Sequence, residues 1–113
     1  MTKRQAEKCM VIAHLIDMKS AFVTQQAEDR RRWECRVVGI GAFDPYENYG
    51  DALEVFVRLK LAARSSIKGR IGRVFECWVD GCPEDFSVGA TPNEAVCAHA
   101  LKIAELKAKE ATP

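Results

Sequence analysis

The most informative pattern of apolar and polar positions lies near the C-terminus, where two alternating segments precede a helix start. Residues 75–79 alternate between apolar and polar side chains, and residues 86–88 repeat this alternation over a shorter length. Thr91 can cap free backbone N–H groups, Pro92 suits the first helical position, and Glu94 completes a capping box. The pattern therefore predicts a strand, a turn, a second strand and a helix, in that order.

The N-terminal part of the chain has a helical period. Thr2 and Gln5 form a second capping box. Apolar side chains then recur at helical spacing in two neighbouring rows, Val11, Leu15, Met18 and Phe22 in the first and Ile12, Ile16 and Val23 in the second. These rows predict a helix that begins at Lys3 and ends near Arg30.

The period then changes to two, which is typical of strands. Residues 33–38 alternate, and residues 53–61 show the longest alternation, with aliphatic side chains at every odd position. Short connections between such segments favour an antiparallel meander. We expect one α+β domain over residues 1–113: a helix, three or four antiparallel strands and a helix, with the helices packed on the aliphatic face of the sheet.

Composition narrows the class of protein. The chain has 113 residues, of which 48% are hydrophobic and 29% charged, as in soluble globular domains. Its longest apolar run is too short to span a bilayer, so we expect a cytoplasmic protein with no membrane contact. Five cysteines at irregular spacing do not indicate a disulfide framework. Because the net charge is only +1, any electrostatic recognition must come from local clusters of charged side chains.

The charges fall in blocks of one sign. Between residues 41 and 54, and again between 76 and 100, all charged side chains are acidic, whereas residues 55–75 carry only bases. On a meander, one end of the sheet would gather the acids. The other end would gather the bases Arg30, Arg31, Arg32, Arg64, Lys68, Arg70 and Arg73. This basic end is a candidate site for phosphate or for an acidic protein surface, and the alternative is a set of solvated loops.

Two groups of aromatic residues are further candidates for contact. The acidic loop at residues 41–51 contains Phe43, Asp44, Tyr46, Glu47 and Tyr49, a composition that suits a protein–protein contact. The alternative is that these aromatics fold back onto the sheet edge. On the polar face of the predicted sheet, Phe56 and Trp78 would lie with Arg36 and Arg58, as a platform on which bases could stack. The alternative there is that a helix or a second copy of the chain covers them.

The residues give little support to a metal site or to catalysis. Cys77, Cys82, Cys97 and His99 invite comparison with a zinc site. However, residues two apart on a helix point about 200° away from each other, so Cys97 and His99 would not converge on one ion. No nucleophile, acid and base stand in a recognisable arrangement. We expect no metal, no cofactor and no enzymatic activity.

The helix start resembles a known family. Thr91, Pro92, Glu94, Ala95, Val96, Cys97, Ala100 and Leu101 follow a Thr-Pro-x-Glu-Ala-(Ile/Val)-Cys-x-x-Ala-Leu pattern. This segment is similar to the last helix of small tailed-phage proteins grouped as the phage "ABA sandwich" domain. The resemblance implies a phage or prophage origin and a non-catalytic protein. It leads to our first hypothesis, an accessory protein that binds a host protein or nucleoprotein complex and inhibits a host defence complex, as anti-CRISPR proteins do.

The order helix, strands, helix is also similar to that of double-stranded RNA-binding domains. That family grips phosphates with lysines at the start of its last helix, where this chain has Glu94. This acid stands where the family needs a base, which counts against the resemblance. The second hypothesis, a module that binds RNA or DNA through the basic loop and the basic end of the sheet, rests instead on the basic residues 30–32 and 64–73. A second copy of the chain is a further candidate partner.

Overall fold

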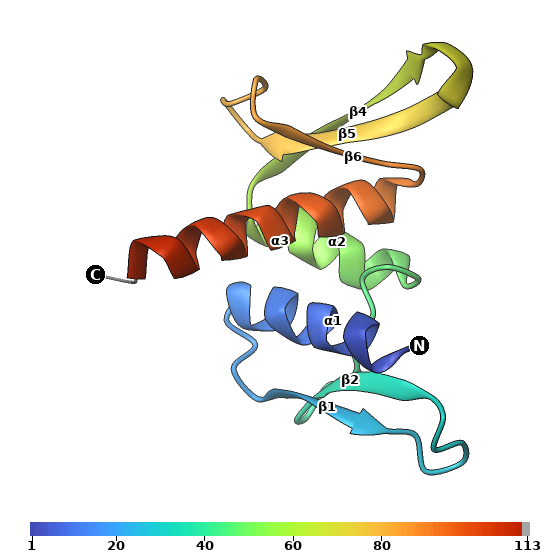
Figure 1. Cartoon of the computed structure of the whole chain (residues 1–113). Helices are drawn as coiled ribbons and strands as arrows, with labels where there is room; N and C mark the ends of the chain where they lie inside the picture. Colours follow the sequence, from blue (N-terminus) through green and yellow to red (C-terminus); the bar gives the residue numbers. More distant parts are fainter. Residues whose placement is uncertain (112–113) are drawn as a thin grey trace.

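In the computed structural model, which describes residues 1–111, a layer of helices lies between two small sheets (Figure 1). The elements are α1 (Lys3–Leu15), β1 (Ala21–Gln25), β2 (Trp33–Val37), β3 (Gly41–Ala42), α2 (Tyr49–Arg58), β4 (Leu61–Lys68), a 3-10 turn (Gly69–Ile71), β5 (Gly72–Val79), β6 (Phe86–Gly89) and α3 (Pro92–Ala111). The sheets have the orders β1-β2-β3 and β4-β5-β6, and all their pairs are antiparallel. The predicted α+β class, with meander strands and helices packed on them, is confirmed, and the structure adds a second sheet and a third helix.

The first helix is shorter than predicted. Its start is as expected, because the Thr2 hydroxyl accepts a hydrogen bond from the Gln5 N–H. The helix ends at Leu15 instead of continuing to Arg30, because Asp17 adopts a positive φ of 66° and the Met18 N–H donates to the Ala13 carbonyl. This is the C-terminal motif that satisfies the last free carbonyls of a helix. Residues 21–25, with β-branched and aromatic side chains, then pair with β2 as a strand.

The longest alternating segment is a helix in the structure, so the predicted strand at residues 53–61 is wrong. The Asn48 side chain caps α2 by accepting a hydrogen bond from the Asp51 N–H. Ala52 and Val55 lie in the core on one side of this helix, at helical spacing. Helical pairing also joins Glu54 to Arg58, whose side-chain atoms lie 2.6 Å apart.

The basic segment at residues 64–73 is also different from the prediction. Instead of a basic loop at one end of a sheet, it forms most of the β4–β5 hairpin, in which Arg64 lies opposite Glu76 and Lys68 lies opposite Gly72. The 3-10 turn at Gly69–Ile71 closes the hairpin.

The C-terminal part follows the prediction closely. The strands predicted at residues 33–38, 75–79 and 86–88 correspond to β2, β5 and β6, and α3 begins at Pro92. The Thr91 hydroxyl accepts a hydrogen bond from the Glu94 N–H, while the Glu94 carboxylate accepts one from the Ala90 N–H. Side chains at the start of α3 therefore satisfy two backbone N–H groups that the helix itself leaves without partners.

One core joins the two sheets through the helices. Cys9 and Ile12 of α1, Cys35 of β2, Cys77 of β5 and Cys97 of α3 are all buried in it, together with other side chains of these elements. α3 lies against β5, β6, α1 and α2, while α1 also covers β1 and β2. Most of the interior is thus aliphatic or thiol, arranged around α3 and α1.

The expected separation of charge into two ends is not observed. The Arg30–Arg32 segment lies in the β1–β2 turn, whereas the other bases belong to the β4–β5 hairpin, and these two turns lie on opposite sides of the helical layer (Figure 1). Asp44 and Glu47 lie beside the N-terminus of the chain, Asp51 lies in the first turn of α2, and Asp80, Glu84 and Asp85 lie in the β5–β6 turn. The prediction failed because it placed residues 53–61 in the same sheet as the flanking strands.

Candidate functional site

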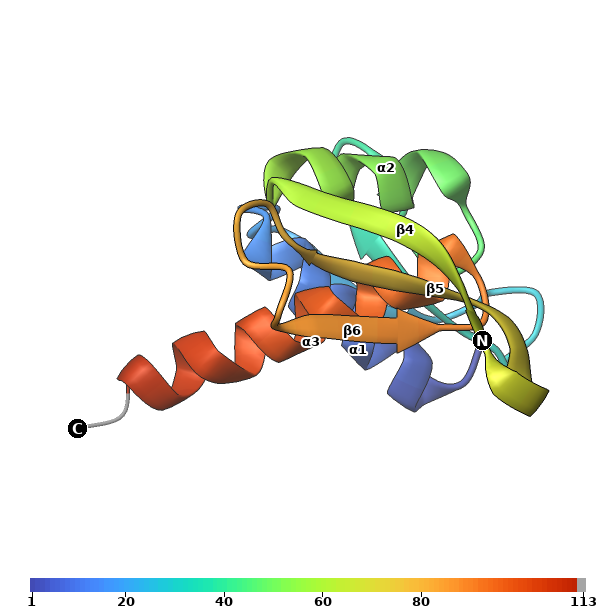
Figure 2. The same ribbon diagram turned by 90° about the horizontal axis from the view of Figure 1, so that it is seen from above.

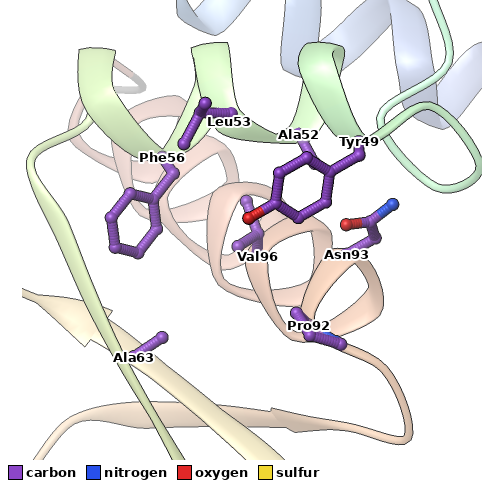
Figure 3. Close-up of a pocket in the computed structure, with 8 residues that line it drawn as sticks. All are labelled: Tyr49, Ala52, Leu53, Phe56, Ala63, Pro92, Asn93 and Val96. Carbon is purple, nitrogen blue, oxygen red and sulfur yellow. The ribbon is translucent and has the colours of Figure 1, made fainter.

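An apolar groove lies between α2, β4 and the start of α3 (Figure 3). Its cavity has a volume of about 190 Å³. Three elements that are distant in the sequence supply its walls: Tyr49, Ala52, Leu53 and Phe56 from α2, Ala63 from β4, and Pro92, Asn93 and Val96 from α3. Apart from the Tyr49 hydroxyl and the Asn93 side chain, the groove offers only carbon, so it suits an apolar side chain better than a charged ligand.

The outer side of α2 extends this apolar surface. Tyr49, Leu53 and Val57 follow each other at intervals of four residues, with exposed fractions of 69%, 48% and 63%. Residues at this spacing share one face of a helix. A stripe of large exposed apolar side chains next to an apolar cavity is typical of an interaction surface.

The loop that precedes α2 is held in place by hydrogen bonds. The Asp51 carboxylate accepts a hydrogen bond from the Asp44 N–H at 2.9 Å, and the Asp44 carboxylate accepts one from the Tyr46 N–H at 3.1 Å. The Asn93 side chain donates to the Tyr46 carbonyl at 3.2 Å, which ties the loop to the start of α3. The wall of the groove formed by α2 is therefore positioned by contacts on both sides of the loop.

The residues predicted as a protein-contact loop are divided between the core and the surface. Phe43 is 1% exposed and belongs to the core, so this side chain folds back into the protein instead of forming a contact surface. Tyr46 is partly buried against the core, whereas Tyr49 is exposed and lines the groove. Asp44 is half-buried and Glu47 is exposed near the N-terminus.

The outer face of the β4–β5–β6 sheet carries a second arrangement, built around a buried acid. Glu76 is 0% exposed and lies 3.1 Å from the Arg64 guanidinium and 3.3 Å from the Lys68 amine. The same two bases cover aromatic rings, Arg64 over Trp78 and Lys68 over Phe86. Cations and aromatics thus share this face, as predicted for Trp78, but Phe56, Arg36 and Arg58 belong to other elements.

The Glu76 carboxyl is ionised at neutral pH. Burial acts to raise its pKa, but hydrogen bonds from Arg64, Lys68 and Ser66 outweigh this effect and hold the pKa below its usual range. The two bases are therefore partly neutralised within the protein, and they offer less charge to an external anion than their number indicates.

This carboxylate should make the stability of the protein dependent on acid pH. Because the pKa of Glu76 is lower in the folded chain than in the unfolded chain, its contribution is present above about pH 4.5 and is lost as the pH falls through the folded-state pKa. In urea denaturation between about pH 6 and about pH 3, Glu76→Gln should reduce the loss of stability seen in the wild type. The control is Glu84→Gln, in the exposed β5–β6 turn. An equal acid-side loss in wild type and Glu76→Gln would contradict this assignment.

The remaining predicted basic residues have local partners or lie at the surface. Arg31 and Arg32 lie 3.4 Å and 3.7 Å from the carboxylate of Asp29 in the β1–β2 turn, and Arg30 is exposed beside them. Arg73 donates a hydrogen bond to the Ser65 hydroxyl. Arg70 is exposed in the 3-10 turn. The structure thus places the predicted set in two separate groups.

The cysteines and the histidine considered for zinc do not converge. Burial raises the pKa of the Cys77 thiol to about 11 and raises that of Cys97 still further, so both thiols are neutral in the core. Within residues 1–111, no group of three or more His, Cys, Asp or Glu side chains could hold a metal ion. His99, expected to point away from Cys97, is buried with its Nδ1 atom 2.9 Å from the Ser87 hydroxyl. Burial lowers its pKa, which keeps the imidazole neutral.

Comparisons with known proteins found no matching family model, no similar curated protein and no similar solved structure. Among the described helices, none has the length and apolar character needed to cross a membrane.

The sequence prediction missed the groove. Of its lining residues, Tyr49 was predicted in a contact loop and Phe56 in a stacking platform on a sheet face, so the two were assigned to different sites. The signals that could have revealed it are the cap at Asn48 and the row Ala52, Val55, Phe56 and Leu59, which together favour a helix over a strand.

Proposed function

We propose that this chain is a binding protein that acts by occupying the surface of a partner protein, without a chemical step. The groove between α2, β4 and α3 carries this proposal, because Tyr49, Leu53 and Val57 expose apolar surface beside a cavity of about 190 Å³. A partner side chain that fills the cavity would bury both surfaces, which is the arrangement of binding hot spots in protein interfaces.

The proposed biological form is a phage or prophage accessory factor that occludes a host macromolecule, such as a defence complex. It rests on the resemblance of residues 91–101 to the last helix of the phage "ABA sandwich" domain. An apolar groove is compatible with occlusion, because occlusion requires only a stable contact.

The second candidate function is binding of single-stranded nucleic acid on the outer face of the β4–β5–β6 sheet. The observation in its favour is that Trp78 and Phe86 lie there together with Arg64 and Lys68. Glu76 weakens this candidate, because its ionised carboxylate already pairs with both bases. We therefore favour the protein partner.

Capture from a bacterial lysate with paired variants tests the proposal. Leu53→Glu places a charge in the groove, whereas the control Val38→Glu makes the same change at a side chain that is 68% exposed in the other half of the molecule. We expect a protein recovered by wild type and by Val38→Glu to be reduced by about tenfold or more with Leu53→Glu. Equal recovery by all three would contradict the proposal. Recovery that is abolished by nuclease and unaffected by Leu53→Glu would favour the nucleic-acid candidate instead.

A further inference from the structure

The β4 strand has one edge without a strand neighbour. Its eight residues pair with β5, and β4 is the outermost strand of its sheet within residues 1–111. Figure 2 shows β5 on one side of β4 and α2 on the other. An edge strand presents unpaired N–H and C=O groups, which can pair with an added strand.

This edge borders the groove described above. Ala63 of β4 lines the cavity, and because side chains alternate along a strand, Ser65 and Ile67 lie on the same face. All three are exposed, and Ile67 has an exposed fraction of 70%. A strand placed along β4 would therefore direct every second side chain toward the cavity and this open face, and the others toward solvent.

The charge around the edge specifies the chemistry of the occupant. From Lys60 to Arg73 the chain has five bases and no acid. Arg64 and Lys68 share the single carboxylate of Glu76, and Arg70 and Lys60 are exposed. Glu76 offsets one of the two charges of Arg64 and Lys68, so a net positive charge remains along the edge together with Lys60 and Arg70, and an acidic segment would complement it.

The same charges disfavour a second copy of this chain at the edge. In an antiparallel pair of two β4 strands centred on Ser66, Arg64 and Lys68 of one copy would lie close to Lys68 and Arg64 of the other. Like charges across a strand pair are destabilising. A partner rich in Asp or Glu avoids this repulsion.

We propose that the groove binds an extended segment of a partner protein in which acidic and apolar residues alternate, and that this segment pairs with the free edge of β4 as an additional strand. Backbone pairing supplies affinity in this mode of recognition, and the cavity selects an apolar side chain. This inference rests on the proposed function and names the form of the partner.

The test uses the full chain and the peptide acetyl-Glu-Val-Glu-Leu-Glu-Val-Glu-amide. Binding is followed by titration calorimetry, and amide hydrogen exchange is measured residue by residue. We expect slower exchange at alternate amides of residues 61–68 and an affinity about tenfold weaker when Lys replaces every Glu of the peptide.

Two neighbouring alanines provide the matched variants. Ala63→Leu adds a side chain that fills the cavity, while Ala62→Leu adds the same group on the opposite face of the strand. We expect Ala63→Leu to weaken peptide binding by about tenfold or more and Ala62→Leu to change it by less than about threefold.

Several results would overturn the inference. These are no binding at millimolar peptide, equal binding of the Lys peptide, binding without protection in β4, or a dimer of the chain that protects β4 in the absence of peptide. A single-stranded oligonucleotide that protects β4 and competes with the peptide would also overturn it. If Leu53→Glu abolishes protein capture while β4 stays unprotected, the groove function stands and the strand pairing fails. If Leu53→Glu leaves capture unchanged, the proposed function itself fails.

Discussion

Replacing Phe43 by alanine should lower the free energy of unfolding by about 3–5 kcal/mol. The Phe43 side chain is 1% exposed and contacts the core that joins α1, β2 and α3, so its removal leaves a cavity in the centre of the molecule. Denaturant unfolding followed by circular dichroism measures this change.

The matched control for this prediction comes from the same loop region. Tyr49→Ala removes an aromatic side chain that is 69% exposed, and it should change the stability by less than about 0.5 kcal/mol. If Phe43→Ala were as stable as Tyr49→Ala, the loop would not fold back into the core as described. Tyr49→Ala should instead weaken capture of the partner, because Tyr49 lines the groove.

Gly89→Ala should be destabilising by about 2–3 kcal/mol, because β6 approaches the first turn of α3 closely at this residue. A Cβ atom there would lie 2.8 Å from the Glu94 carbonyl carbon and 2.9 Å from the Glu94 Cβ, and it would also overlap the Ala95 backbone nitrogen. Backbone atoms of a capped helix cannot move aside as a flexible side chain can. The measurement is again denaturant unfolding.

Gly50→Ala is the control for the glycine prediction. The added methyl group would contact the Asn48 side chain at 3.2 Å, and alanine favours the helix that begins at Tyr49. We expect a stability within about 1 kcal/mol of wild type. Equal stability of the two glycine variants would show that β6 and α3 are not in close contact.

Local signals predicted the elements that local contacts determine. Thr91 and Glu94 cap α3 through hydrogen bonds within a few residues, so the sequence alone indicates where this helix begins. Residues 33–37 and 75–79 alternate in sequence and form strands in the structure, where each pairs with the strand that precedes it in a hairpin.

Residues 53–61 show why the rest of the fold was not predictable. Their alternation is compatible with a strand, but Val55 and Leu59 are also four residues apart and share a face of a helix. Two contacts decide for the helix: the cap at Asn48, and the burial of Ala52 and Val55 against the core. The burial depends on tertiary packing, so the sequence pattern does not show it. Once this segment was placed in a sheet, the charges were assigned to the wrong ends.

The sequence could not predict the groove, for a related reason. The groove forms only where a helix, a strand and a second helix pack together, which brings Phe56, Ala63 and Val96 to one cavity. Within its own segment, none of these side chains shows a pattern that indicates a binding site. Glu76 is a similar case, since its position in an alternating strand predicts exposure, whereas Arg64 and Lys68 bury it.

Hydrogen exchange of the full chain in complex with the captured partner shows whether the groove between α2, β4 and α3 is the binding site. We expect residues 49–57 of α2 and residues 61–68 of β4 to exchange more slowly in the complex, and the Arg30–Arg32 turn to be unchanged. Protection confined to the β1–β2 turn, or to strands β5 and β6 without α2, would contradict the assignment of the groove as the binding site.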